Sequence, residues 1–268
     1  MPQELTDVRY EVDDGLAWIV IDRPKRMNSF RARTLDELIA CFRRAWADPD
    51  VGVVCLTGEG DRAFCTGGDQ KQRAETGDYG PSESGIWEIE GIQRIIRAIP
   101  KPVVAAVNGY AIGGGHVLQV LCDLSIASST AIFGQAGPRA GSFDAGFGTS
   151  YLARIVGEKR AREIWFLCRQ YDAETAERWG LVNKIVPPEE LRAEVRRWAD
   201  EMMALSPTAL KFLKSSFNVD SEHLAGVATL ANAGLHEFVN SEEAREGNTA
   251  FNQKRAPDYA RFRASVSG

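Results

Sequence analysis

Short apolar runs alternate with helical patterns along the first half of the chain, from residue 8 to about residue 135. A short apolar run bounded by polar residues favours a buried strand. Candidate strands span residues 16–21, 51–56, 103–107, 124–127 and 132–133. Strands and helices that alternate in this way form parallel sheets with right-handed crossovers and helices outside the sheet, so the sequence predicts an α/β fold.

Residues 34–47 predict the first crossover helix. Thr34 followed by Glu37 predicts a capping box at its start. Its apolar residues fall on one helical face, made of Leu35, Leu38, Ile39, Phe42, Ala45 and Trp46. We therefore expect this face to pack against the sheet.

The strand pattern fades after about residue 155, and helical patterns follow one another to residue 252. Expected helices span residues 160–168, 173–179, 189–204, 208–217, 222–238 and 242–252. We therefore divide the chain into a core of residues 1–200 and a helical C-terminal region of residues 201–268. This region is too small for a core of its own and should pack on its α/β body or on a neighbouring subunit. The polar stretch 72–84 predicts a mobile surface loop.

Charge, hydropathy and cysteine content exclude several classes of protein. Lys and Arg number 32 against 37 Asp and Glu, which leaves no basic excess for a nucleic-acid partner. The apolar runs are too short to span a bilayer and the N-terminus has no signal-peptide core, so we expect a cytoplasmic protein without a membrane partner. Five widely spaced cysteines predict reduced, buried thiols, and three histidines predict no metal centre.

Two glycine clusters follow apolar runs, one at Gly67-Gly68 and one at Gly113-Gly114-Gly115. Glycine lets the backbone approach a ligand, and N–H groups at a helix start bind negative charge. Two such groups from separate loops can form an oxyanion hole. The alternative is that both clusters are tight turns between packed elements. No nucleotide-binding glycine motif accompanies either cluster.

The chain resembles the crotonase superfamily, also called enoyl-CoA hydratase/isomerase, in three segments: FCTGGDQ, NGYAIGGGHVLQVLCDLSIAS and AIFGQAGPRAGS. The resemblance extends from Arg23 to Arg255. It implies a spiral of β/β/α turns with a helical C-terminal trimerisation region, assembled as a homotrimer or a hexamer. It also implies an acyl-CoA thioester substrate, with coenzyme A as part of that substrate and no tightly bound cofactor. The backbone amides that hold the thioester oxygen correspond to Gly68 and Gly114.

The catalytic carboxylates distinguish branches of this superfamily. Members that hydrate enoyl-CoA carry two glutamates at the positions of Val117 and Gly137, so a simple hydratase of that type is disfavoured. The segment GSFDAGFG, residues 141–148, resembles a branch containing 1,4-dihydroxy-2-naphthoyl-CoA synthase and 2-ketocyclohexanecarboxyl-CoA hydrolase. That resemblance assigns substrate hydrogen bonding and proton transfer to Ser142 and Asp144. Without it, the same residues suit a turn before a helix.

Two further groups of residues resemble the synthase. Its members with glycine at the position of Gly137 hold a bicarbonate ion as the base, together with a Gln and a Trp that match Gln135 and Trp165. These two residues can instead serve only in packing. A second resemblance, in the loop after Gly68, assigns binding of the substrate's acidic group to Lys71, Arg73 and Tyr79, although a solvated loop would carry the same residue types. Residues 216–226 and the N-terminal third look nearer to the hydrolase.

The C-terminal region departs from both enzymes at one position. Each has a tyrosine that reaches the site of a neighbouring subunit, and Val239 stands there, beside Phe238. His236, one turn away, could substitute or could be a plain surface histidine. The CoA phosphates are assigned to four basic residues, Lys25, Arg26, Lys254 and Arg255.

These observations predict an acyl-CoA enzyme that makes or breaks a C–C bond next to a keto group through a thioester enolate. Among such reactions, the sequence most resembles that of an enzyme for the Dieckmann (Claisen) ring closure, 1,4-dihydroxy-2-naphthoyl-CoA synthase. Three alternatives stay open: a ring-opening hydrolase, an enoyl-CoA hydratase or isomerase with Asp144 as its only acid/base, and an inactive CoA-binding scaffold.

Overall fold

Two sheets form the frame of the computed structural model, which describes residues 5–266. Among these residues the larger sheet has six strands in the order β1-β2-β3-β5-β7-β10, and the smaller has the order β4-β6-β8-β9. The larger sheet consists of β1 (Val8–Asp13), β2 (Leu16–Ile21), β3 (Val53–Gly58), β5 (Val103–Val107), β7 (Leu124–Ser128) and β10 (Lys184–Val186). The smaller consists of β4 (Ala63–Cys65), β6 (Tyr110–Ile112), β8 (Ile132–Gly134) and β9 (Gln170–Asp172).

The chain winds through the two sheets as a spiral. Strand β3 is followed by β4, β5 by β6 and β7 by β8, and helices follow each pair, so every turn adds one strand to each sheet. The helices are α1 (Ala32–Ala47), α2 (Gln70–Thr76), α3 (Ile89–Ala98), α4 (Gly114–Leu121), α5 (Phe147–Val156), α6 (Glu158–Leu167), α7 (Ala173–Arg178), α8 (Leu191–Met203), α9 (Pro207–Val219), α10 (Leu224–Val239) and α11 (Glu242–Asn252). The expected α/β spiral of β/β/α turns is confirmed.

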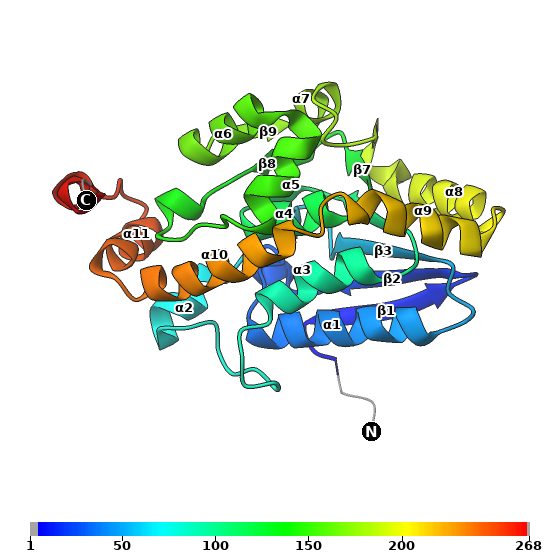
Figure 1. Ribbon diagram of the computed structural model, residues 1–268, viewed down its shortest axis with the longest axis horizontal. Coiled ribbons are helices and arrows are strands. Elements are labelled where there is room, and N and C mark those ends of the chain that lie inside the picture. The colour runs from blue at the N-terminus through cyan, green and yellow to red at the C-terminus, as the bar shows by residue number, and fades with distance from the viewer. Residues whose placement is uncertain (1–4, 267–268) are drawn as a thin grey trace.

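Alternate residues of the larger sheet face two different helical layers. In β2, Ala17, Ile19 and Ile21 pack into the main core with α1, α3 and α4, whereas Leu16, Trp18 and Val20 pack with α8. All six residues of β2 are buried because both faces of the sheet are covered, as Figure 1 shows for α1 and α3. The sequence predicts parallel strands, but two strand pairs differ from this expectation. Pairs β1–β2 and β8–β9 are antiparallel, the first joined by a turn in which Asp14 and Gly15 have positive φ.

The predicted capping box at residue 34 is wrong. Helix α1 begins at Ala32, two residues earlier, and the Thr34 hydroxyl accepts from the N–H of Arg31 at 3.1 Å. The Glu37 carboxylate accepts instead from three backbone N–H groups at the start of β1, at 2.7–3.1 Å. This buried glutamate therefore joins α1 to the first strand. On the same helix, Trp46 is 44% exposed and does not share the buried face.

The predicted loop 72–84 is partly wrong, because α2 occupies Gln70–Thr76. Asp69 caps this helix by accepting from the N–H of Gln72 at 3.2 Å, and Gly77 ends it with a φ of +83°. The irregular stretch is therefore shorter than expected and begins at Gly77.

The C-terminal helices pack along the body of their own chain. Helix α10 contacts α3 and α5 and leads into α11, which lies against α2; Figure 1 shows this orange helix running across the molecule. Lys214 anchors α9 from a buried position, since its Nζ donates to the carbonyl oxygens of Ile96 and Lys101 at 3.0 Å and to Asp123 at 2.7 Å. Packing on its own α/β body is one of the two arrangements that the sequence predicts for this region.

Two further expectations concern cysteines and membranes. All five cysteines are unpaired and buried, as the sequence predicts. None of the helices in the described part of the chain is long and apolar enough to cross a membrane.

Candidate functional site

The two glycine clusters meet in the folded chain. Gly67 has a φ of +81°, a conformation that residues other than glycine rarely adopt. A Cβ atom added there would lie 2.9 Å from the backbone nitrogen of Gly114, so the two turns are in contact. Gly115 packs still more closely, because a Cβ on it would lie 2.0 Å from the carbonyl oxygen of Cys65. Glycine is therefore needed for these backbones to approach one another, as the tight-turn interpretation expects.

The packing leaves the amides of Gly68 and Gly114 without partners. On either side of Gly68, the N–H of Phe30 donates to Gly67 at 2.8 Å and the N–H of Asp69 donates to the carbonyl of Phe30 at 2.9 Å. Gly114 is the first residue of α4, where N–H groups have no intrahelical acceptor. In the part of the chain that the structure describes, neither amide donates a hydrogen bond. Both can therefore bind an oxygen atom that carries negative charge.

Asp144 lies beside the same helix. Val117 is one turn after Gly114 in α4. A Cβ added to Gly148 would lie 2.8 Å from Cγ2 of Val117. The same point lies 2.9 Å from Cγ of Asp144 and 2.9 Å from Cζ2 of Trp165. Three side chains thus surround Gly148. One of them places a carboxylate next to Val117, where a hydratase of the crotonase superfamily is expected to carry a glutamate.

Hydrogen bonds fix the orientation of the Asp144 carboxylate. It accepts from the N–H groups of Gly148 at 2.9 Å and Gly146 at 3.3 Å, and from Nε2 of Gln93 at 3.0 Å. Burial raises the pKa of this carboxyl, and the hydrogen bonds counteract only part of the effect. An aspartate with a raised pKa can exchange protons nearer to neutral pH. Because Gly148 lies in the first turn of α5, this arrangement also fits the interpretation of a turn before a helix.

Gln93 is a site residue that the sequence analysis missed. It is 2% exposed and lies on α3 among the buried Ile92, Ile95 and Ile96. A glutamine within an apolar helical face is the signal that could have singled it out, because a buried amide needs a partner.

Gly137 and Ser142 are brought together, at the backbone. The N–H of Ser142 donates to the carbonyl of Gly137 at 2.9 Å. A Cβ on Gly137 would lie 2.9 Å from the carbonyl oxygen of Ser142, so a side chain there would displace the segment that carries Asp144. The space that glycine leaves is therefore filled by the chain itself.

Gln135 and Trp165 carry buried polar atoms that would suit a small oxyanion. Nε2 of Gln135 lies 3.2 Å from Nδ1 of His116, while Oε1 of Gln135 and Nε1 of Trp165 have no hydrogen-bond partner in the described chain. An acceptor and a donor without partners match the two kinds of group on bicarbonate. Burial lowers the pKa of His116 to about 4, so this histidine is neutral. The bicarbonate site stays a prediction.

The three residues predicted to bind an acidic group have different environments. Lys71 is exposed, whereas Arg73 is buried and donates to the carbonyl oxygens of Gly141 at 3.4 Å and Val239 at 3.5 Å. Tyr79 stacks on Trp87 with ring centroids 4.5 Å apart. Its ring also covers Gly68, since a Cβ there would lie 2.7–2.9 Å from three ring and hydroxyl atoms. Of these three residues, Tyr79 is therefore the one whose side chain lies against Gly68.

Helix α10 carries Val239, which stands where the synthase and the hydrolase are expected to carry a tyrosine. The carbonyl of Val239 faces Arg73, and Phe238 packs against Phe143 with ring centroids 5.5 Å apart. His236 is exposed, which fits the surface-histidine interpretation.

The predicted phosphate-binding residues form two groups near the surface, in which Arg26 is half-buried and the other three are exposed. Lys25 and Arg26 lie on a short 3-10 turn after β2, and Lys254 follows α11. Arg255 is engaged in its own chain, because its guanidinium donates to both oxygens of Glu246 at 2.6 and 2.9 Å. No cluster of three or more potential metal ligands occurs among residues 5–266.

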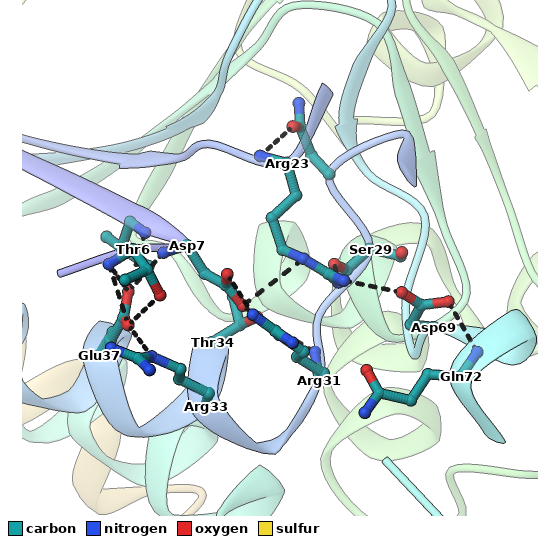
Figure 2. Close-up of polar contacts among 12 residues, drawn as sticks. Thr6, Asp7, Arg23, Ser29, Arg31, Arg33, Thr34, Glu37, Asp69 and Gln72 are labelled. Atoms are coloured by element: carbon teal, nitrogen blue, oxygen red, sulfur yellow. Dashed lines mark hydrogen bonds and ion pairs between the residues drawn. The ribbon is translucent and has the colours of Figure 1, made fainter. Parts of the chain in front are cut away.

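A buried polar network beside Gly68 also escaped the sequence analysis (Figure 2). Arg23 forms an ion pair of 2.8 Å with Asp69 and lies 3.5 Å from Asp7, which in turn pairs with Arg31 at 2.7 Å. Asp69 follows Gly68 directly in the chain, so this network reaches the first glycine cluster.

Comparisons with known proteins identify the family and the fold. The family model described as enoyl-CoA hydratase/isomerase matches residues 11–261. An enoyl-CoA hydratase from Mycobacterium avium subsp. paratuberculosis is 29% identical, with a TM-score of 0.84 over 95% of this chain and 99% of that one. A carnitinyl-CoA hydratase from Mycobacterium avium is 28% identical, with a TM-score of 0.84 over 95% and 98%.

An enoyl-CoA hydratase/isomerase from Pseudoalteromonas atlantica is 26% identical to this chain, with a TM-score of 0.85 over 94% of this chain and 99% of that one. The family model and the three structures each cover almost the full length, and they agree on one architecture. The chain belongs to the enoyl-CoA hydratase/isomerase family, the crotonase superfamily of acyl-CoA enzymes.

Proposed function

We propose that this protein moves a proton along the acyl chain of an enoyl-CoA thioester, with Asp144 as its acid/base, so that a double bond changes position. The observation that carries the proposal is the single carboxylate beside Gly148, next to Val117 and one helical turn from Gly114. One carboxylate can take a proton from one carbon and return it to another. Hydration of the type that uses two glutamates is disfavoured, since Val117 and Gly137 occupy the positions of those glutamates.

The chemistry begins at the thioester carbonyl. The amides of Gly68 and Gly114 would donate to its oxygen, and each such donor is worth about 3 kcal/mol in the transition state. The charge that they stabilise is that of an enolate, formed as Asp144 takes a proton from the carbon chain. The neutral Asp144 then returns the proton to a different carbon, and the carbonyl re-forms. Gln93 and two backbone amides hold the carboxylate in place through both steps.

Carbon–carbon bond chemistry is the second candidate, because it needs the same enolate. It is favoured by the partly exposed Ser142, two residues before Asp144, and by the buried polar atoms of Gln135 and Trp165 that lack partners in the described chain. Those two residues would hold bicarbonate, which would supply a base. Ring closure of the naphthoate-synthase type and ring opening of the hydrolase type both remain within this candidate.

Product analysis separates the candidates. The protein is incubated separately with 3-enoyl-CoA, 2-enoyl-CoA, succinylbenzoyl-CoA and 2-ketocyclohexanecarboxyl-CoA, with and without bicarbonate, and products are identified by mass and retention time. Conversion of 3-enoyl-CoA to 2-enoyl-CoA supports the first proposal. A hydroxyacyl-CoA product formed from 2-enoyl-CoA would instead show that the protein is a hydratase. A ring-closed or ring-opened product would support the second candidate. CoA binding without any product would indicate an inactive scaffold.

The pH dependence follows from the raised pKa of Asp144. Because the ionised carboxylate takes the first proton, kcat/KM should fall as the pH drops through this pKa, which lies above the ordinary 3.8. Stability has the opposite trend: the protonated carboxyl stabilises the fold fully below the unfolded pKa, and this contribution is lost as pH rises through the folded pKa. Rates and urea midpoints measured from about pH 4 to 8 test both slopes. A profile of kcat/KM without an acid limb contradicts the assignment.

Self-association is proposed on the C-terminal helices. Phe212 and Phe217 on α9 and Leu230 on α10 are 66%, 80% and 75% exposed, an apolar surface that a second copy could cover. Light scattering after size exclusion should give a trimer or hexamer, and Phe217→Asp should dissociate it. Trp46→Asp, which instead removes an exposed apolar side chain of α1, is the control that should keep the assembly. A wild-type monomer contradicts this proposal.

A further inference from the structure

The peptide that contains the Gly68 amide is held on both sides. Within it, the carbonyl of Gly67, which shares the peptide plane with the Gly68 N–H, accepts from the N–H of Phe30 at 2.8 Å. After it, the N–H of Asp69 donates to the carbonyl of Phe30 at 2.9 Å. These two bonds align the peptide with the backbone of Phe30, and the side chain of Asp69 holds the segment directly after it.

Arg23 holds that side chain. Its guanidinium donates to Oδ2 of Asp69 at 2.8 Å and also to the carbonyl oxygen of Ser29, while the other carboxylate oxygen of Asp69 caps α2 (Figure 2). The side chains of Arg23 and Asp69 are 11% and 3% exposed. An ion pair removed from water in this way is rigid, because breaking it leaves an uncompensated charge.

The network behind Arg23 restrains it further. Nε of Arg23 lies 3.5 Å from Asp7, and Arg31 holds the same Asp7 through two bonds of 2.7 and 2.9 Å (Figure 2). Arg31 touches Asp7 but forms no bond with Asp69 among the described residues. The two arginines therefore share one anchor, and only Arg23 extends from it to the segment that follows Gly68.

We infer that Arg23 is a positioning residue that holds the peptide of the Gly68 N–H in place, because it bonds to Ser29 directly before Phe30 and to Asp69 directly after Gly68. The inference rests on the proposed use of this amide to polarise a thioester carbonyl. A buried ion pair is weak support for stability by itself, since apolar residues often serve as well. Its placement one residue after the amide explains why a charged pair is used there.

A chromophoric thioester, 4-dimethylaminocinnamoyl-CoA, reads the amide directly, because polarisation of its carbonyl moves its absorbance to longer wavelength. Arg23→Gln should bind this probe with a dissociation constant near that of the wild type and lose most of the red shift. Turnover should show kcat lowered by about 10-fold to 100-fold with little change in KM, since small displacements of a polarising group cost rate rather than binding. Arg23→Lys should recover part of the shift, because one ammonium cannot reproduce the fork of bonds.

Arg31→Gln is the matched control, because it loosens the same Asp7 anchor without touching Asp69; it should keep the full red shift. If Arg23→Gln does not fold, Arg23→Lys carries the test, and its shift must then lie below that of the wild type. An undiminished shift and kcat in the Arg23 variants overturn the inference alone. A wild-type complex without a red shift overturns the proposed function, and the inference with it.

Discussion

Asp144→Asn is expected to lower kcat by about 10² to 10⁴, the contribution of a positioned acid/base group. The amide has nearly the same shape and keeps an oxygen that can accept from the N–H of Gly148, now at 2.9 Å from the carboxylate. It cannot take up or release a proton at neutral pH. Steady-state rates on the substrate that the wild type turns over measure the loss, and binding of the CoA thioester should be nearly unchanged.

Asp172→Asn is the matched control for this variant. Asp172 also caps a helix, accepting from the N–H of Thr175 at 2.8 Å, but it lies on β9 outside the side chains that surround Gly148. It should keep full activity. Because burial raises the pKa of Asp144, the Asn variant should be at least as stable as the wild type at neutral pH, which excludes misfolding as the cause. More than a tenth of wild-type turnover in Asp144→Asn would remove Asp144 from the mechanism.

Lys214→Met is expected to lower the free energy of unfolding by about 1–3 kcal/mol, the cost of leaving buried carbonyl oxygens without a donor. The ammonium group of Lys214 connects α9 to three acceptors, the carbonyls of Ile96 and Lys101 and the carboxylate of Asp123. Its side chain is 7% exposed, so water cannot replace it. Urea unfolding followed by circular dichroism measures the change.

Lys211→Met on the same helix is the control, because Lys211 is exposed. Surface substitutions of this kind usually change stability by less than about 0.5 kcal/mol. Equal unfolding midpoints for the two methionine variants would show that the buried ammonium contributes nothing beyond its aliphatic stem.

The strands and the glycine turns could be predicted because their signals are local. Strand 16–21 and strand 103–107 are apolar throughout, and burial on both faces requires this. The start of α1 could not be predicted, because Glu37 follows Thr34 at the spacing of a capping box but turns to the N–H groups of β1. Local spacing cannot show which distant backbone groups compete for a carboxylate.

The site was predictable only as separate segments. Gly114 and Asp144 were identified, but that Val117 and Trp165 join Asp144 around Gly148 depends on how three helices pack. Gln93 was missed for the same reason, since its partner lies 51 residues away. A pattern in the sequence names residue types, whereas shared burial and hydrogen bonding arise from the fold.

The segment that carries Asp144 rests on the last helices of the chain. A Cβ on Gly141 would lie 2.1 Å from the carbonyl oxygen of Ala244 in α11, and Phe143 packs on Phe238 in α10. Because α10 and α11 follow the α/β spiral in the chain, they leave the ribosome after it. The nascent polypeptide can therefore support the Asp144 segment in this way only once α10 and α11 have been synthesised.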